Sequence, residues 1–136
     1  RMIVLAWNPG NATISKLPPC HYTFAFNVLG NKLNCHLTQR SGDIALGIPF
    51  NLACYSLLTM MIAKECGYEV GEFAHTIIDA HIYENHIEGL KEQLTREPLK
   101  LAKIKIADKP FNELAFEDIV LEDYESHPVI KFEVAV

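Results

Sequence analysis

Alternating and continuous apolar positions predict strands in the first third of the chain. Residues 2–7 are apolar throughout, which is typical of a buried strand. From Cys20 to Val28 every second side chain is apolar, and this period of two predicts a strand with one face in the core. Gly30-Asn31 has the composition of a hairpin turn, and Lys32–Gln39 repeats the alternation. The pattern therefore predicts a strand-rich sheet with at least one hairpin.

Residues Phe50–Cys66 would carry apolar side chains on nearly every side of a helix. Pro49 suits the first turn, where its missing N–H costs nothing, and Gly67 suits the end. A helix without a polar face usually lies in the centre of a domain. A membrane span is the alternative, but the apolar run is too short and polar side chains such as Asn51 interrupt it. We therefore expect a long, buried central helix and no membrane partner.

The second half of the chain predicts shorter elements. Glu72–Ile78 is a strand candidate, and Tyr83–Arg96 has the apolar stripe and polar face of an amphipathic helix. Two further strands are expected at Lys103–Ile106 and Val129–Val134. With no repeat and no internal linker, residues 1–136 are expected to belong to one α+β domain, a sheet packed against the buried helix.

Composition and charge narrow the function. Of 136 residues, 49% are hydrophobic and 21% are charged, which is typical of a globular chain. The net charge of -5 argues against a DNA-binding protein, because phosphate backbones are bound by clustered lysine and arginine. The chain opens on an apolar run without a leader, so we expect it to begin inside a domain.

The four cysteines do not have the spacing of a zinc site or of a redox motif. None forms a CxxC pair, and no secretory signal precedes them. We therefore expect all four thiols to be reduced and the protein to be cytoplasmic.

Cys20 is the first candidate for chemistry. It follows the stiff pair Pro18-Pro19, and a cysteine becomes nucleophilic where a nearby cation or hydrogen-bond donor stabilises its thiolate. The alternative is a cysteine packed in the core as a small hydrophobic side chain. Both interpretations stay open on the sequence pattern.

Arg40 and Ser41 form a second candidate, because a planar guanidinium next to a hydroxyl suits a phosphate group. The alternative is a solvated loop arginine. Asp43 and Asn51 flank the start of the predicted helix. The Asn51 amide could read the edge of a heterocycle, since it offers both a donor and an acceptor, or it could cap the helix.

The segment from His81 to His86 suggests a metal site at first sight. The two histidines are five residues apart, however, and do not share a helix face as an i, i+4 pair would. We expect no metal. On an extended backbone His81 and Tyr83 would instead point the same way and present two hydrogen-bonding groups.

Several segments together resemble the thymidylate synthase family in their order and spacing. They are Leu17-Pro18-Pro19-Cys20-His21, Gln39-Arg40-Ser41-Gly42-Asp43, Leu46-Gly47-Ile48-Pro49-Phe50-Asn51, Asp79-Ala80-His81-Ile82-Tyr83, Gln93-Leu94-Thr95-Arg96-Glu97-Pro98, His127-Pro128 and Val134-Ala135-Val136. The resemblance covers essentially the whole chain and corresponds to about the C-terminal half of a typical member. It implies a mixed sheet around the central helix, incomplete without the N-terminal half.

The resemblance also implies a reaction. Family members are methyltransferases of nucleotide biosynthesis that convert dUMP to dTMP, with 5,10-methylenetetrahydrofolate as carbon donor and reductant. By this resemblance Cys20 attacks C6 of the uracil ring, and Arg40 with Ser41 holds the phosphate and favours the Cys20 thiolate. Arg1 corresponds to an arginine that reaches the phosphate site of a partner subunit, which implies a homodimer.

The remaining site residues follow from the same resemblance. Asn51 would read the uracil edge, and His81 with Tyr83 would bind the deoxyribose hydroxyl. In the folate site, Asp43 would form a hydrogen bond with the pterin ring. Its other contacts would come from Leu46, Gly47, Phe50 and Ala135, the last within a C-terminal lid.

Among the departures of this chain from the family, Ile77-Ile78 replaces two glycines and is expected to add bulk to the pocket near the nucleotide. The family's general acid/base glutamate and further phosphate-binding arginines belong to the N-terminal half, so this chain alone is expected to be inactive. Two alternatives stay open, a dUMP hydroxymethylase and a catalytically inactive, dimerising nucleotide-binding fragment.

Overall fold

The computed structural model describes residues 2–135. By their internal contacts, the residues up to Ile82 form one compact unit and those from Tyr83 onward form another. Each unit is described separately. The assignment of residues 1–136 to one domain stays a prediction.

The first unit is built on a four-stranded sheet in the order β1-β2-β3-β4. The strands are β1 (Met2–Leu5), β2 (His21–Leu29), β3 (Lys32–Asp43) and β4 (Glu69–His81). β1, β2 and β3 pair antiparallel, whereas β3 and β4 pair parallel, which confirms the expected mixed sheet. β2 and β3 meet in the predicted hairpin, where Gly30 has a φ of 61°. That backbone conformation is open to glycine at little cost.

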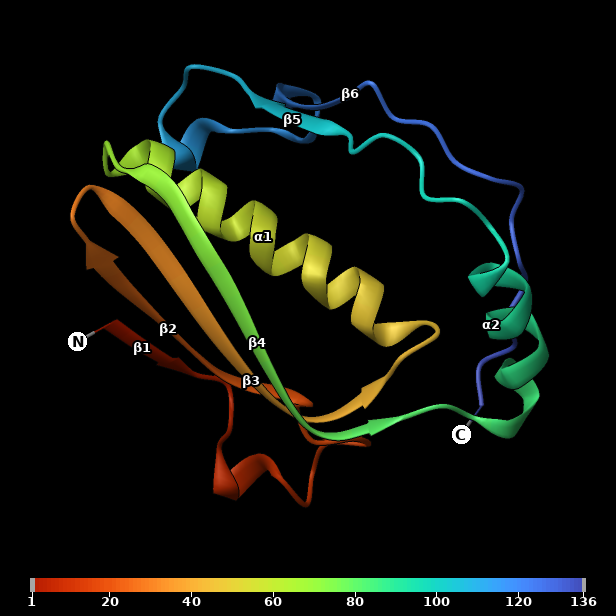
Figure 1. Ribbon diagram of the computed structural model, residues 1–136. Coiled ribbons are helices and arrows are strands. Elements are labelled where there is room, and N and C mark those ends of the chain that lie inside the picture. Colours follow the sequence, from red (N-terminus) through yellow and green to blue (C-terminus); the bar gives the residue numbers. More distant parts are fainter. Residues whose placement is uncertain (1, 136) are drawn as a thin grey trace. The chain divides into compact units, whose positions relative to one another are not determined.

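Helix α1 (Gly47–Glu65) connects the two parallel strands and lies across one face of the sheet (Figure 1). Side chains of alternate β3 residues face it, and Leu33, Cys35 and Leu37 are almost completely buried. Each buried leucine stabilises the unit by about 2 kcal/mol. The helix ends before Gly67, whose φ of 70° gives the left-handed C-terminal conformation. Both predicted ends of the helix are therefore confirmed to within a few residues.

Burial of α1 on all sides is not what the structure shows. Its buried side chains form a single stripe, Ile48, Tyr55, Thr59 and Ala63. Phe50 on its first turn is 71% exposed. The stripe packs on β3 and β4, the elements of the same unit that α1 contacts most.

The prediction of a buried strand at residues 2–7 is wrong in part. A strand forms over Met2–Leu5, but all four of its side chains are exposed. β1 is the edge strand of the sheet and pairs only with β2, so its apolar composition reflects strand propensity rather than burial in this unit.

The second unit contains α2 (Ile87–Leu94), preceded by a 3₁₀ turn at Glu84–His86, and a two-stranded sheet. Its strands are β5 (Lys103–Ile106) and β6 (Ile119–Glu122), which pair antiparallel. The expected helix over Tyr83–Arg96 is therefore shorter than predicted. β6 was not expected from the sequence pattern.

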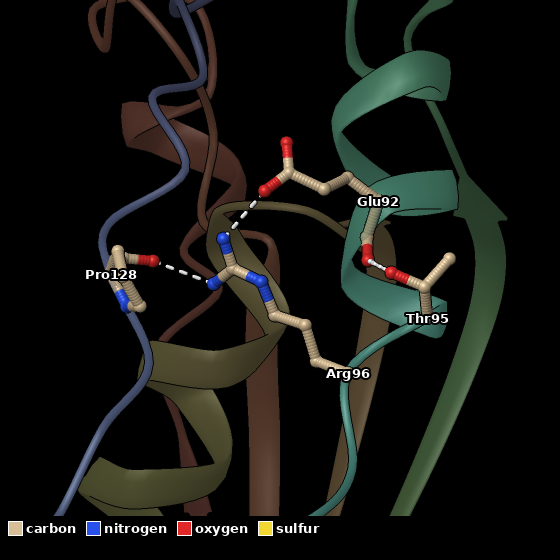
Figure 2. Close-up of polar contacts among 4 residues, drawn as sticks. All are labelled: Glu92, Thr95, Arg96 and Pro128. Carbon is tan, nitrogen blue, oxygen red and sulfur yellow. Dashed lines mark hydrogen bonds and ion pairs between the residues drawn. The ribbon is translucent and has the colours of Figure 1, made fainter.

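The expected strand at Val129–Val134 is absent from the structure. The carbonyl oxygen of Glu133 accepts a hydrogen bond from Nε2 of His86 (2.6 Å). Just upstream, Arg96 donates to the carbonyl oxygen of Pro128 (2.6 Å) and to the carboxylate of Glu92 (2.6 Å), as Figure 2 shows. Side chains of the same unit thus contact two main-chain carbonyls here, Pro128 and Glu133.

Candidate active site

Strand register brings most of the candidate residues to one end of the first sheet. The main-chain N–H of Arg40 donates to the carbonyl oxygen of Cys20 (2.8 Å), so the start of β2 lies beside the end of β3. Asp43 lies opposite His81, the last residues of the two parallel strands. α1 begins four residues after Asp43. The residues gathered at this end are Cys20, Arg40, Ser41, Asp43, Leu46, Gly47, Phe50, Asn51 and His81.

Arg40 holds the backbone that leads to Cys20. Its Nε donates to the carbonyl oxygen of Pro19 (3.1 Å), and its Nη2 donates to that of Pro18 (2.7 Å). Together with the main-chain bond to Cys20, three hydrogen bonds tie this segment to one residue of β3. The half-buried Cys20 thiol is therefore carried on a segment with a defined course.

The turn into α1 is organised by Asp43. Its Oδ1 accepts a hydrogen bond from the main-chain N–H of Ala45 (2.9 Å). Leu46 occupies the N-cap position and makes no side-chain cap bond. Asn51 is the fifth residue of the helix, so the capping role that the sequence pattern left open for Asn51 is wrong.

A buried polar network supports Asn51, and Gln39 at its centre was not predicted from the sequence as a site residue. Gln39 is only 3% exposed. Its Nε2 donates to Oδ1 of Asn51 (3.0 Å) and to the carbonyl oxygen of Ser41 (2.9 Å), and its Oε1 contacts Nε2 of His75 (2.9 Å). The sequence did contain a signal for this role. Gln39 follows Leu33, Cys35 and Leu37 at every second position of the strand, on the side expected to be buried, but its side chain is polar.

A second polar contact lies directly beyond the candidate nucleophile. Nδ1 of His21 contacts the hydroxyl of Tyr55 (2.8 Å), and the two rings meet edge to face. Burial raises the pKa of Tyr55, and the neighbouring Cys35 and Cys54 add to this effect. The phenol is thus held in its protonated form next to the imidazole.

The surroundings of His75 favour its neutral form. Burial lowers the pKa of His75 below its ordinary value of 6.5, and the nearby His21 and His36 imidazoles lower it further. A neutral imidazole carries one N–H, so its tautomer depends on its hydrogen-bond partner.

His81 and Tyr83 fall in different units. Nδ1 of His81 lies 3.5 Å from a carboxylate oxygen of Asp79. Tyr83 opens the second unit, where its ring packs edge to face on His86. Ala135 belongs to the same unit and is half-buried, whereas Arg1 lies outside the described residues.

The departure at Ile77-Ile78 affects the two faces of β4 differently. Ile77 lies in register with Gln39 on β3, and a methyl group placed on Gly42 would come within 3.1 Å of its Cγ2. Ile78 is 67% exposed. Ile77 therefore fills space beside Gly42, close to the end of β3.

Within residues 2–135 no three potential ligands among the His, Cys, Asp and Glu side chains lie close enough to hold one metal ion. In the same part of the chain no helix combines the length and the apolarity needed to cross a bilayer. A hollow of about 500 Å³ lies on the sheet away from the candidate residues, lined in part by Asn34, His36 and Glu72.

Comparison with known proteins identifies the family. The sequence profile described as "Thymidylate synthase" matches residues 1–136, and the chain therefore belongs to this family. A protein named thymidylate synthase from Mycoplasma pneumoniae is 54% identical over 137 residues, which cover 100% of this chain and 48% of the relative. One of the same name from Haloferax volcanii is 41% identical, with 99% of this chain and 54% of the relative covered. The chain thus spans about half the length of these relatives.

Proposed function

We propose that the protein converts dUMP to dTMP, with Cys20 as the nucleophile. The thiolate adds to C6 of the uracil ring, which makes C5 nucleophilic, and it leaves again at the end of the reaction. 5,10-methylenetetrahydrofolate supplies the carbon and two electrons, so dihydrofolate is the second product. Covalent addition divides one difficult substitution into easier steps.

The observation that carries this proposal is the convergence of the family's nucleophile and phosphate positions. Cys20 and Arg40 are twenty residues apart in sequence but share a backbone hydrogen bond, and the Arg40 guanidinium holds the segment before the thiol. In this proposal the Arg40 guanidinium also stabilises the thiolate, because a nearby cation activates a cysteine.

Phosphate binding is assigned to Arg40 and Ser41. The side-chain hydrogen bonds from Arg40 to Pro18 and Pro19 use two of its five N–H donors, which leaves donors for phosphate oxygens. We also propose a homodimer in which Arg1 reaches the phosphate site of the partner subunit.

Nucleoside recognition is assigned to Asn51, His81 and Tyr83. Asn51 would pair with the uracil edge, because its amide offers one donor group and one acceptor. His81, at the end of β4, would bind the deoxyribose hydroxyl together with Tyr83.

The folate site is assigned to the turn before α1 and its first residues. Phe50 is an exposed aromatic side chain, and Leu46 and Gly47 are half-exposed beside it. An apolar surface next to the Asp43 carboxylate suits a flat heterocycle with hydrogen-bonding groups on its edge. Ala135 would close over this site within a C-terminal lid.

The reaction can be tested by trapping. Incubation of the complete gene product with 5-fluoro-dUMP and 5,10-methylenetetrahydrofolate should give a stable covalent adduct, because fluorine cannot leave C5 as the proton does. Intact-protein mass spectrometry should show an added mass equal to both small molecules.

Peptide mapping should place the adduct on Cys20, and Cys20→Ser should abolish it. An adduct on another cysteine would contradict the assignment of the nucleophile. With dUMP itself the product should be 5-methyl, and a 5-hydroxymethyl product would instead indicate the hydroxymethylase.

We further propose that this chain is the C-terminal part of a cytoplasmic enzyme and is inactive alone. The described residues contain no carboxylate assigned as the general acid/base, and α1 has exposed apolar sides that a further segment would bury. The isolated 136-residue chain should therefore form no dTMP in a steady-state assay with both substrates. Sustained turnover by the purified chain would show that the missing roles are filled from within it.

A further inference from the structure

Two side chains of the second unit bind the same main-chain carbonyl, that of Glu133. Nε2 of His86 lies 2.6 Å from this oxygen, and Nδ2 of Asn85 lies 3.4 Å from it. A carbonyl oxygen can only accept, so the ring nitrogen of His86 that faces it must carry hydrogen. Both donors belong to the 3₁₀ turn Glu84–His86 that leads into α2. The chain at Glu133 is therefore held from the start of this helix.

The bond from His86 to Glu133 is made by a fully buried ring. The His86 imidazole meets the ring of Phe132 edge to face at a centroid distance of 5.1 Å, and that of Tyr83 in the same way at 5.6 Å. Water has little access to such a ring and cannot readily replace the carbonyl as its partner. A buried donor left without an acceptor is strongly disfavoured, so this bond should persist while the unit is folded.

Gly89 lets α2 approach the same segment closely (Figure 1). A methyl group placed on Gly89 would come within 2.5 Å of Cε1 of Phe132 and within 3.0 Å of Cγ2 of Ile130. Contacts of this length would force the segment away from the helix. Glycine is unfavourable inside a helix compared with alanine, so helix formation does not account for Gly89. Close approach of Phe132 does.

We infer that His86 and Gly89 are positioning residues that fix the chain at Phe132-Glu133, so that the lid proposed for Ala135 pivots directly after Glu133. The inference rests on the proposed function, in which Ala135 closes over the folate site. Val134, the first residue after the fixed point, is 78% exposed. A lid that pivots there has few residues to order on closure, so little conformational entropy is lost.

Gly89→Ala in the complete gene product is the first test. Alanine favours the helix, but its methyl group should displace Phe132 and with it the start of the lid. The KM for 5,10-methylenetetrahydrofolate should rise about tenfold and kcat should fall by about the same factor, because a changed hinge alters both constants. The Kd of dUMP, measured by calorimetry, should stay within about a factor of two. An unchanged KM, or equal weakening of dUMP and folate, would overturn the inference.

Two variants of His86 test the hydrogen bond itself. Glutamine carries an amide N–H that can reach the Glu133 carbonyl, whereas leucine fills similar space without a donor. His86→Leu should raise the folate KM about tenfold, and His86→Gln should recover most of that loss. Both changes alter the packing of Tyr83, so the difference between them reports on the bond. Equal folate KM values in the two variants would contradict the role of His86.

His127→Leu is the matched control. Nε2 of His127 also contacts a main-chain carbonyl of the second unit, that of Glu97, at 2.8 Å. The substitution removes the same kind of bond away from the lid. It should lower thermal stability and leave the folate KM within about a factor of two. A rise as large as that in His86→Leu would show that any loss of stability in this unit disturbs the lid, and would overturn the inference.

Trimming by a carboxypeptidase of broad specificity tests the fixed point without substrates, and it decides if the variants do not fold. Intact-protein mass spectrometry of the wild type should show rapid trimming that goes no further than Glu133. Rapid loss of Phe132 from the wild type would overturn the inference and leave the proposed function standing. Trimming that stops at Glu133 in a protein that binds neither dUMP nor folate would overturn the proposed function, and the lid with it.

Discussion

Replacement of Cys20 by serine should lower the turnover number for dTMP formation by a factor on the order of 10⁴ or more. The thiolate is a strong nucleophile near neutral pH, whereas a serine hydroxyl needs a strong base to reach a comparable state. The change preserves size and the backbone bond between Cys20 and Arg40, so the affinity for dUMP should change little. Steady-state assays of the complete gene product, together with dUMP binding by calorimetry, measure both quantities.

The other cysteines provide matched controls. Cys54 and Cys66 are exposed, and their change to serine should leave turnover within about a factor of two. Cys35 is buried between the sheet and α1, and burial raises the pKa of its thiol, with a smaller opposing effect of the Thr59 hydrogen bond. Its thiolate is therefore disfavoured. A loss of turnover in Cys54→Ser as large as in Cys20→Ser would contradict the assignment.

The elements set by local chemistry were predicted well. The alternation over β2 and β3, the hairpin at Gly30-Asn31 and the helix between Pro49 and Gly67 all depend on neighbouring residues. Hydropathy did not predict which surface each apolar side chain meets. α1 buries one stripe, and β1 is an exposed edge, because the partner of an apolar face is a matter of tertiary structure.

The sequence suggested members for the candidate site, whose roles stay predictions, but it did not suggest how they connect. Gln39 and His75 are 36 residues apart, and they meet because β3 and β4 run parallel around the intervening helix. No local pattern gives that register. The contact of Arg40 with the carbonyls before Cys20 is equally a product of the β2–β3 pairing.

Replacement of Arg40 by alanine should lower kcat/KM for dUMP by a factor on the order of 10³, with effects on both constants. KM should rise because a phosphate contact is lost. kcat should fall because the carbonyls of Pro18 and Pro19 lose the donors that hold the segment before Cys20. Arg40→Lys separates the two roles, since an ammonium keeps the charge but cannot reproduce the planar fork across two carbonyls.

We expect Arg40→Lys to recover much of the KM while kcat stays at least about tenfold low. The rate of 5-fluoro-dUMP adduct formation should fall in parallel with kcat, because both require the same placement of the thiol.

Arg96→Ala is the matched control (Figure 2). Like Arg40, Arg96 donates to a backbone carbonyl, and it also pairs with Glu92, but it is not one of the proposed site residues. Its replacement should lower stability with little change in either constant. If Arg40→Ala raised KM and left kcat intact, the guanidinium would serve the phosphate alone, and the order of the Cys20 segment would have to come from its prolines.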